Sequence, residues 1–434
     1  MNASRPYKFV YGFKPLLTLC IFVMLSVSPV VASADEIQNR FDAAMAALEA
    51  EQVYTARRLL RELLADYPTL YRARLELARA DYLARDFDAA EAEVLQVLED
   101  PELPPSVQTT LLAFLAQIRD DQQTFAKRHR WSFDVYGGGM YDSNVNYGVS
   151  RDIVDLGGQG FTVLPGSKEI DAWAAVVDGG VLHTFSPGIT FEAGESTGFF
   201  LWQTQANGYN RSYKDESDYN LSVATLRTGP AWVVPEKWNA TIGLQGDQVW
   251  FGGSRLAFFT SVNPTVGFSL SDVTEVFAGL TYTNRNYNKD IDTGRDGEMY
   301  RGNLDISRVF LERSLGLQAG VAYTDFHADF DIFAYKGPEV YTGGTYNAWL
   351  GGTIFASVGY RRFKYQEAIP FPAGLPDRDD DEYRFTTGFE HLFDSGVLES
   401  WVLRGEWVYT DNKSNLDIYD FDRDQLSLGL QRRF

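Results

Sequence analysis

Hydrophobic positions follow two different periods along the chain, and the period changes near residue 130. From Asp35 to about Asp121, Ala and Leu recur every three or four residues, as in "YRARLELARADYLA", which is the spacing of an amphipathic helix. After "KRHR" (127–130), apolar and aromatic residues alternate with small or polar ones to the end of the chain, as in strands. The pattern predicts a helical domain at 35–126 and a β-domain at 127–434.

The helical part contains an internal repeat. Segment 51–68 aligns with segment 84–101, so that Tyr54 matches Phe87 and Pro68 matches Pro101. The period and the closing proline are similar to tetratricopeptide repeats, in which paired helices stack side by side. "PPSVQTTLLAFLAQIRD" then predicts a final helix. Such arrays usually bind peptides or partner helices, although a spacer without a ligand remains open.

The β-part reads as about fourteen strands. They are predicted to begin near Trp131, Asp171, Gly198, Tyr219, Trp238, Leu256, Thr274, Glu298, Ser314, Glu339, Thr353, Glu382, Ser400 and Phe421. Short connections such as "VPEKW" and "LSDVT" alternate with long polar ones such as "EAIPFPAGLPDRDDD". The long connection at 186–198 breaks this rule and leaves open a third strand that begins near Ile189.

This layout predicts the fold class. We expect a short all-α, tetratricopeptide-like N-terminal domain followed by a roughly fourteen-stranded antiparallel outer-membrane β-barrel. A sheet crosses lipid only when it is closed, because lipid offers the backbone no hydrogen bonds. The final Phe434 resembles the C-terminal signal that barrel-assembly machinery reads, although Arg432 stands where an apolar residue is usual. A soluble β-sandwich is the alternative.

The N-terminus and the net charge indicate where the protein acts and which partners it does not bind. Residues 1–34 read as a secretory signal peptide, with basic side chains, an apolar run and a small-residue cleavage site at Ala32-Ser33-Ala34. Cys20 is the only cysteine and lies in this segment, so we expect no disulfide and no thiolate metal site in the mature chain. The net charge of −20 argues against nucleic acid as a partner.

Candidate chemistry is sparse. The four histidines form no His-x-x-x-His pair, which gives a metal site little support. His391 and Ser395 suggest a hydrolase pair, but they fall at an expected turn, where Asp-Ser-Gly is ordinary. The acidic run 377–382 could bind Ca²⁺ but lacks the spacing of an EF-hand, so a solvated loop is favoured. The sequence therefore predicts no catalytic residue, no cofactor and no metal site.

The junction "RHRWSFDVYGGGMYDSNVN" carries the candidate site residues. Trp131, Phe133 and Val135 are expected on the lipid-facing side of the first strand, and Ser132, Asp134 and Tyr136 on the lumen side. The positions singled out as structural or cargo-contacting are Trp131, Asp142, Ser143, Asn144, Asn146 and Phe434. For the Asx group, closure of the strand by local hydrogen bonds is favoured over contact with a cargo.

With these elements the chain resembles the Slam family, the surface lipoprotein assembly modulators, also described as the type XI secretion translocon. The resemblance covers the repeats, the Pro-Pro-led helix, the basic junction and the first strand with "DSNVN". It implies an outer-membrane translocon without enzymatic activity, with a periplasmic helical domain. The implied partners are surface lipoprotein or secreted protein cargo, periplasmic chaperones, barrel-assembly machinery and outer-membrane lipid. A porin-like solute channel, a barrel enzyme and an adhesin are the alternatives.

Overall fold

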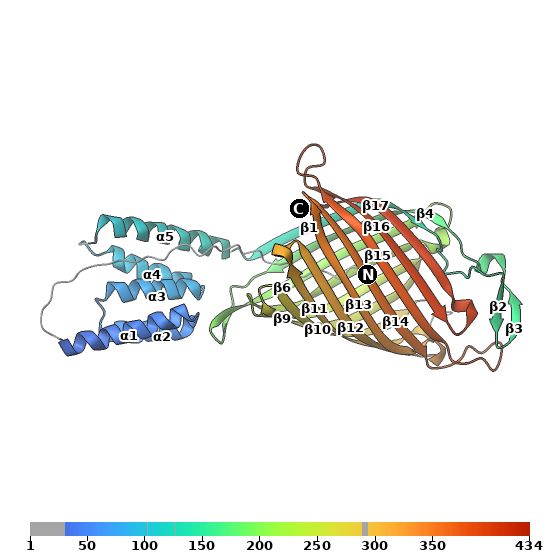
Figure 1. The fold of residues 1–434 in the computed structure, drawn as a ribbon, viewed down its shortest axis with the longest axis horizontal. Helices are drawn as coiled ribbons and strands as arrows, with labels where there is room; N and C mark the ends of the chain where they lie inside the picture. The colour runs from blue at the N-terminus through green and yellow to red at the C-terminus, as the bar shows by residue number, and fades with distance from the viewer. Residues whose placement is uncertain (1–30, 102, 126, 289–293) are drawn as a thin grey trace.

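The computed structural model describes residues 31–434 except 102, 126 and 289–293. Most of the predicted signal peptide, residues 1–30, lies outside the described residues. Five helices come first, and Figure 1 shows them stacked at one end of a β-barrel. They are α1 (Val31–Glu49), α2 (Val53–Asp66), α3 (Tyr71–Leu83), α4 (Phe87–Leu98) and α5 (Pro105–Phe125). Among the described residues, none of the helices combines the length and the apolarity needed to span a bilayer.

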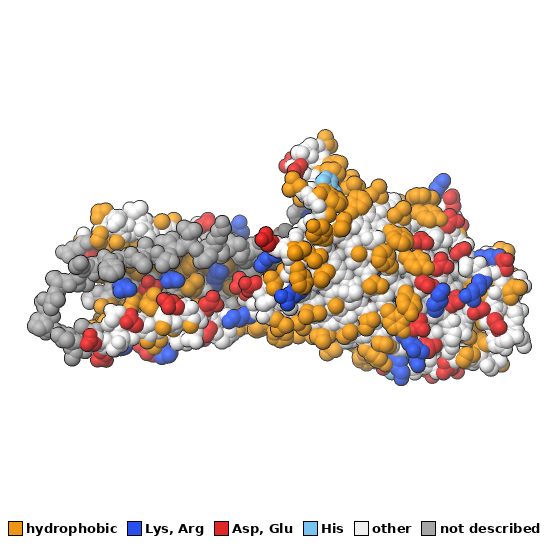
Figure 2. Space-filling model, viewed as in Figure 1, with side chains coloured by type: hydrophobic (Ala, Val, Ile, Leu, Met, Phe, Trp, Pro, Cys, Tyr) orange, Lys and Arg blue, Asp and Glu red, His pale blue; other side chains and the backbone are white. Residues whose placement is uncertain are grey.

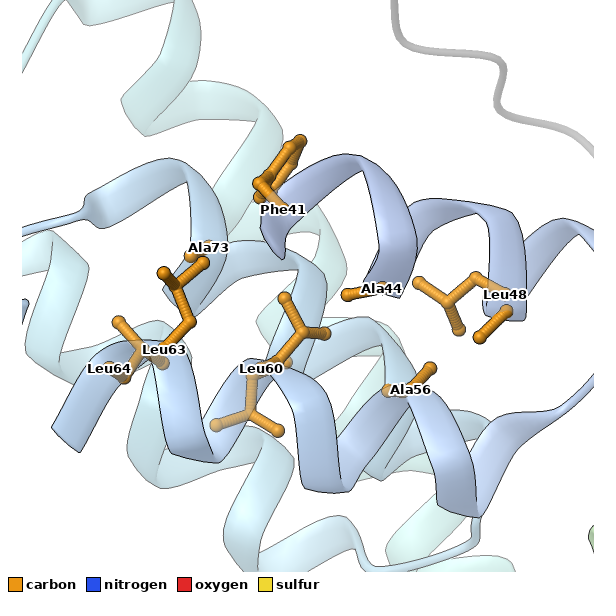
Figure 3. Packing of buried hydrophobic residues seen from close by; sticks show 11 residues of the cluster. Phe41, Ala44, Leu48, Ala56, Leu60, Leu63, Leu64 and Ala73 are labelled. Atoms are coloured by element: carbon orange, nitrogen blue, oxygen red, sulfur yellow. The ribbon is translucent and has the colours of Figure 1, made fainter. Parts of the chain in front are cut away.

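The helices pack around two small apolar cores. In α2, the buried Ala56, Leu60, Leu63 and Leu64 recur on one face, which is the stripe expected of an amphipathic helix. They meet Phe41 and other residues of α1, together with Ala73 and Leu77 of α3 (Figure 3). A second core joins α3, α4 and α5. We call the five helices the helical array.

The rest of the chain forms a closed barrel of fourteen antiparallel strands. The sheet runs in sequence order, and β1 pairs with both β4 and β17, which closes the wall. The wall strands are β1 (His129–Asp142), β4 (Ala172–Phe185), β6 (Ser196–Tyr213), β7 (Leu221–Val234), β8 (Trp238–Phe251), β9 (Ser254–Ser271), β10 (Thr274–Tyr287), β11 (Gly297–Phe310), β12 (Leu315–Ala328), β13 (Tyr335–Trp349), β14 (Gly352–Tyr365), β15 (Asp379–Leu392), β16 (Trp401–Ser414) and β17 (Phe421–Arg433).

Three short strands lie outside this wall. β2 (Ile153–Leu156) and β3 (Gln159–Thr162) pair as a hairpin within the first long loop, at the end of the barrel away from the helices (Figure 1). β5 (Thr190–Ala193) pairs only with the start of β6. It extends a hairpin beyond the rim, which explains why the connection at 186–198 is too long for a simple turn.

The exterior of the barrel is apolar. Along β1, exposed Trp131, Phe133 and Val135 alternate with less exposed Ser132, Asp134 and Tyr136, as expected from the sequence. Leu226, Leu280 and Leu426 are likewise more than half exposed on other strands. Figure 2 shows hydrophobic side chains spread over the wall near the helices, and charged ones gathered at the opposite end. A closed barrel with such a surface is built to lie in lipid.

The predicted strands match the observed ones. All fourteen wall strands are confirmed, and the largest shift in a starting point is at β13, which was expected near Glu339 and begins at Tyr335. The alternative of a third wall strand that begins near Ile189 is wrong, because β6 begins at Ser196 and residues 190–193 form a separate strand, β5. The short hairpin β2–β3 and this separate strand were not predicted. Both are extensions of connections, where four-residue strands carry too little alternation to be recognised.

Candidate functional site

The residue that ends the first strand, Asp142, lies at the seam where the barrel closes. β1 and β17 pair from Asp134 opposite Arg433 to Asp142 opposite Gln425. Arg423 of β17 donates to both oxygens of Asp142, Nε to Oδ1 at 2.8 Å and Nη2 to Oδ2 at 2.5 Å. This two-pronged geometry is the strongest form of carboxylate recognition.

Two more side chains complete the carboxylate's shell. The Tyr213 hydroxyl of β6 donates to Asp142 Oδ2 at 2.5 Å, and Gln425 Nε2 donates to the same oxygen at 3.1 Å. Asp142 is fully buried, and the Arg423 side chain is only 5% exposed. A buried ion pair needs such additional hydrogen bonds to offset its desolvation. The cluster therefore connects β1, β6 and β17 at the closure of the wall.

The rest of "DSNVN" holds the first long loop. Asn144, also fully buried, bonds both backbone groups of Gly148 at 2.8 Å and donates to the Asp422 carbonyl at 3.0 Å. Ser143 Oγ accepts from the Asp424 amide at 2.8 Å. Asn146 bridges to the far end of the loop by accepting from the Ile170 amide at 3.0 Å.

These contacts bear on the two readings of the Asx group. Asp142 and Asn144 have no solvent exposure. Asp142 bonds to Arg423 and Tyr213, and Asn144 bonds to Gly148 and Asp422. The geometry favours strand and loop closure at both positions. Sequence reasoning singled out this group but missed Arg423 and Tyr213, because partners so distant along the chain leave no local pattern.

The other two candidate positions lie at the helix-bearing rim. Trp131 faces outward and stacks on His183 of β4, with ring centroids 4.2 Å apart. Phe434 and Phe133 exchange backbone hydrogen bonds of 3.1 and 2.8 Å, so the last residue extends the seam. The Arg432 guanidinium lies 4.8 Å from the Phe434 ring centroid. Trp131 is thus an interface-type aromatic, and Phe434 belongs to the closing pair of strands.

The lumen is lined by paired charges. On β16, Trp407 faces outward, so Arg404 and Glu406 on the alternate positions face inward. Arg404 binds Glu406 at 2.6 Å and also binds Glu390 of β15. Further inward pairs are Arg301 with Glu339 at 2.8 Å and Arg361 with Glu382 at 2.5 Å. At these positions the wall presents paired charges to the interior.

The sequence favoured a solvated loop for the acidic run 377–382, and this prediction is wrong. Most of it opens β15, and its carboxylates are matched to arginines: Arg362 binds Asp379 through two atoms at 2.9 and 2.6 Å, and Arg378 binds Asp380 at 2.5 Å. Within the described residues, no three His, Cys, Asp or Glu side chains gather as metal ligands would.

The end of the barrel away from the helices is partly filled. Leu156 of the β2–β3 hairpin packs against Leu375 and the buried Leu416 from two other loops. Arg151 ties the same hairpin to Asp417 at 3.2 Å and to Asp420 at 2.9 Å. A cavity of about 560 Å³ lies beside the hairpin, and one of about 370 Å³, lined by aromatic rings and paired charges, adjoins it.

The suspected hydrolase pair is not assembled. His391 Nδ1 accepts from the Trp349 indole at 3.1 Å, and the Ser395 hydroxyl donates to Asp394 at 3.0 Å. Each side chain is engaged with another neighbour, so the arrangement offers no activated serine.

The chain was compared with protein families, curated proteins and solved structures. No protein-family description matches the chain, and no curated protein matches it in sequence. Pseudomonas aeruginosa OprD is similar in structure with a TM-score of 0.35 and 11% identity, over 70% of this chain and 95% of that one. A Pseudomonas aeruginosa FadL homologue has a TM-score of 0.35 and 12% identity, over 71% of this chain and 90% of that one. Acinetobacter baumannii OccAB2 has a TM-score of 0.35 and 11% identity, over 70% of this chain and 98% of that one. The barrel itself is established by this chain's own strand pairing.

Proposed function

We propose that this chain is an outer-membrane translocon that moves specific lipoproteins or related secreted proteins to the cell surface. The observation that carries the proposal is the combination of a closed fourteen-stranded barrel with a helical array held against one rim. Helical repeat faces generally serve protein recognition. In this proposal the array lies in the periplasm, meets the cargo or its chaperones there, and passes the cargo to the barrel.

The lumen and the exterior support a transport role rather than a catalytic one. Several inward-facing charges are paired with neighbours, as at Arg404, so the interior offers a polar route. The apolar exterior fits insertion by barrel-assembly machinery into outer-membrane lipid. Outer membranes lack ATP, so folding of the cargo outside the cell is the proposed source of direction.

The test is surface display of a small secreted or lipid-anchored protein encoded beside this chain. The cargo is expressed with and without this chain, intact cells are treated with protease, and the protected fraction is measured. We expect the chain to raise the accessible fraction strongly, while a periplasmic marker stays protected. Equal accessibility without the chain would contradict the translocon.

A porin-like solute channel is the second candidate, and the polar lumen favours it. In this alternative the helical array is only an adaptor. Purified protein in a planar bilayer separates the two. Stable, large conductance without cargo, combined with no effect on surface display, would support the channel.

A further inference from the structure

The turn between β5 and β6 binds the start of helix α2. Glu195 lies at the tip of this hairpin, between the two strands. Its Oε2 accepts from the backbone amides of Tyr54 at 2.8 Å and Thr55 at 3.1 Å. Its Oε1 accepts from the Thr55 hydroxyl at 2.8 Å. One carboxylate of the barrel thus receives three hydrogen bonds from the first turn of a helix in the array.

Helix α2 lacks an N-cap of its own. Its N-cap residue, Gln52, makes no side-chain capping bond, whereas Asp86 at the same place before α4 accepts from the Ala89 amide. The first amides of a helix have no partner within the helix, and a carboxylate there also meets the positive end of the helix dipole. Glu195 supplies from the barrel the cap that α2 does not provide.

Two further contacts support the same hairpin. The buried Thr197 donates to the Ala84 carbonyl at 2.7 Å, at the C-terminal end of α3. The Tyr54 hydroxyl lies 2.8 Å from Thr197 Oγ1, and it must donate because the Thr197 proton is committed to Ala84. The rings of Phe125 and Phe199 stack at 5.9 Å. The hairpin therefore spans the N-terminus of α2, the end of α3 and the end of α5.

Electrostatics favour the charged form of Glu195. Partial burial acts to raise its pKa, but hydrogen bonds from Thr55 and Tyr54, with the nearby charge of Lys237, outweigh burial and lower the pKa of this carboxyl. The carboxylate is therefore ionised at neutral pH. Strand β5 positions this carboxylate. It pairs with β6 from Thr190 opposite Phe199 to Ala193 opposite Ser196, and so holds the tip of the hairpin out from the rim.

We propose that the β5–β6 hairpin is a docking element that recognises the α2–α3 edge of the helical array and fixes the array in one orientation at the barrel rim. Glu195 and Thr197 are its recognition residues. Because the hairpin occupies this edge, a cargo must use other faces of the array; this consequence rests on the proposed translocon, whereas the docking itself does not.

The docking is measured on the purified full chain in detergent. Spin labels are placed on cysteines at Glu62, on the solvent side of α2, and at Glu236, in the exposed β7–β8 turn. The native Cys20 lies in the expected signal peptide and does not interfere. We expect a single narrow distance distribution. The double variant Glu195→Ala, Thr197→Ala is expected to broaden it, and hydrogen exchange at Tyr54 and Thr55 should rise by about tenfold, as expected for loss of a helix cap.

Control variants make the result specific. Glu192→Ala removes an exposed carboxylate of the same hairpin and should leave the distribution narrow. Glu195→Gln keeps a hydrogen-bond acceptor but loses the charge, so it should broaden the distance distribution partially. This single variant also tests the docking if the double variant fails to fold. A broad distribution in the unmodified chain, or an unchanged one in the double variant, would overturn the docking.

Surface display then separates docking from function. If the double variant undocks but displays cargo as well as the unmodified chain, the orienting role in transport is wrong while the docking stands. If the unmodified chain docks but displays no cargo, the translocon proposal fails instead.

Discussion

At the scale of single residues, the most demanding position is the buried carboxylate of Asp142. The guanidinium of Arg423 compensates its charge, and Tyr213 and Gln425 donate further hydrogen bonds to the carboxylate. Such a group is stable only while its partners remain, because an unpaired buried charge is costly. A similar principle holds in the helical array, where the buried Tyr82 hydroxyl depends on Asp121 and Gln117.

Asp142→Ala is expected to destabilise the barrel by about 3–5 kcal/mol, because Arg423 is left buried without its partner. The measurement is urea unfolding of the detergent-solubilised protein, followed by the mobility difference between folded and unfolded barrels on gels. Asp171→Ala is the control, since this carboxylate is exposed and its bond from the Tyr141 hydroxyl is long, at 3.3 Å. Equal losses in the two variants would contradict the role of the buried pair.

Tyr82→Phe is expected to change the alkaline stability of the helical array. Burial and the bond to Asp121 raise the pKa of Tyr82 to about 12, so the folded form holds its proton more tightly than the unfolded chain, in which tyrosine titrates near 10. This contribution is complete below pH 10 and is lost as the pH rises toward 12.

The comparison is helix unfolding by urea, followed by circular dichroism at 222 nm from pH 8 to 12. The phenylalanine variant should be less stable by about 1 kcal/mol at pH 8 and should show a shallower decline above pH 10. Parallel curves for the two proteins would show that Tyr82 does not contribute to the alkaline loss.

At the scale of elements, the short hairpins are the additions that matter most. β2–β3 is held by an apolar contact at Leu416 and by ion pairs at Arg151, while β5–β6 reaches the helical array. Strands β2, β3 and β5 were not predicted, because each is a four-residue strand inside a connection. Their partners lie on other loops and helices, and such pairings leave no periodicity in the local sequence.

Leu416→Ala is expected to loosen the β2–β3 hairpin more than Arg151→Ala. Removing a buried leucine costs about 2–5 kcal/mol, whereas half-exposed ion pairs contribute about 0–1 kcal/mol. Limited proteolysis within 151–162 reports the difference as a cleavage rate. Leu164→Ala, at an exposed leucine of the same loop, should leave the rate unchanged, and a larger effect from Arg151 than from Leu416 would reverse our ranking.

At the scale of the whole molecule, the barrel combines an apolar exterior with a lumen that carries paired charges. Arg404 lies between Glu390 and Glu406 and neutralises part of both. Loss of this cation leaves net negative charge on the lumen wall, and charged walls concentrate counter-ions. The ion selectivity of any current through the barrel therefore reports whether this wall lines the path.

Arg404→Gln is expected to shift the reversal potential in a salt gradient toward cation selectivity, because the wall loses a positive charge. The measurement uses purified protein in a planar bilayer at low salt, where screening is weak. Arg404→Lys keeps the charge and should retain the original selectivity. A current with unchanged selectivity in the glutamine variant would mean that the conducting path does not pass Arg404.

The sequence by itself determined the two periods, the helical array and all fourteen wall strands, because alternation and helical spacing are local and repeat over many residues. It also singled out Asp142, Ser143, Asn144 and Asn146 as structural or cargo-contact positions. Only the tertiary structure decided what these residues do, since Arg423 and Tyr213 come from strands far along the chain. The same holds for Glu195, whose role as a cap depends on a helix more than a hundred residues earlier. Burial, ion pairing and capping are properties of neighbours in space, and a closed barrel makes its first and last strands neighbours.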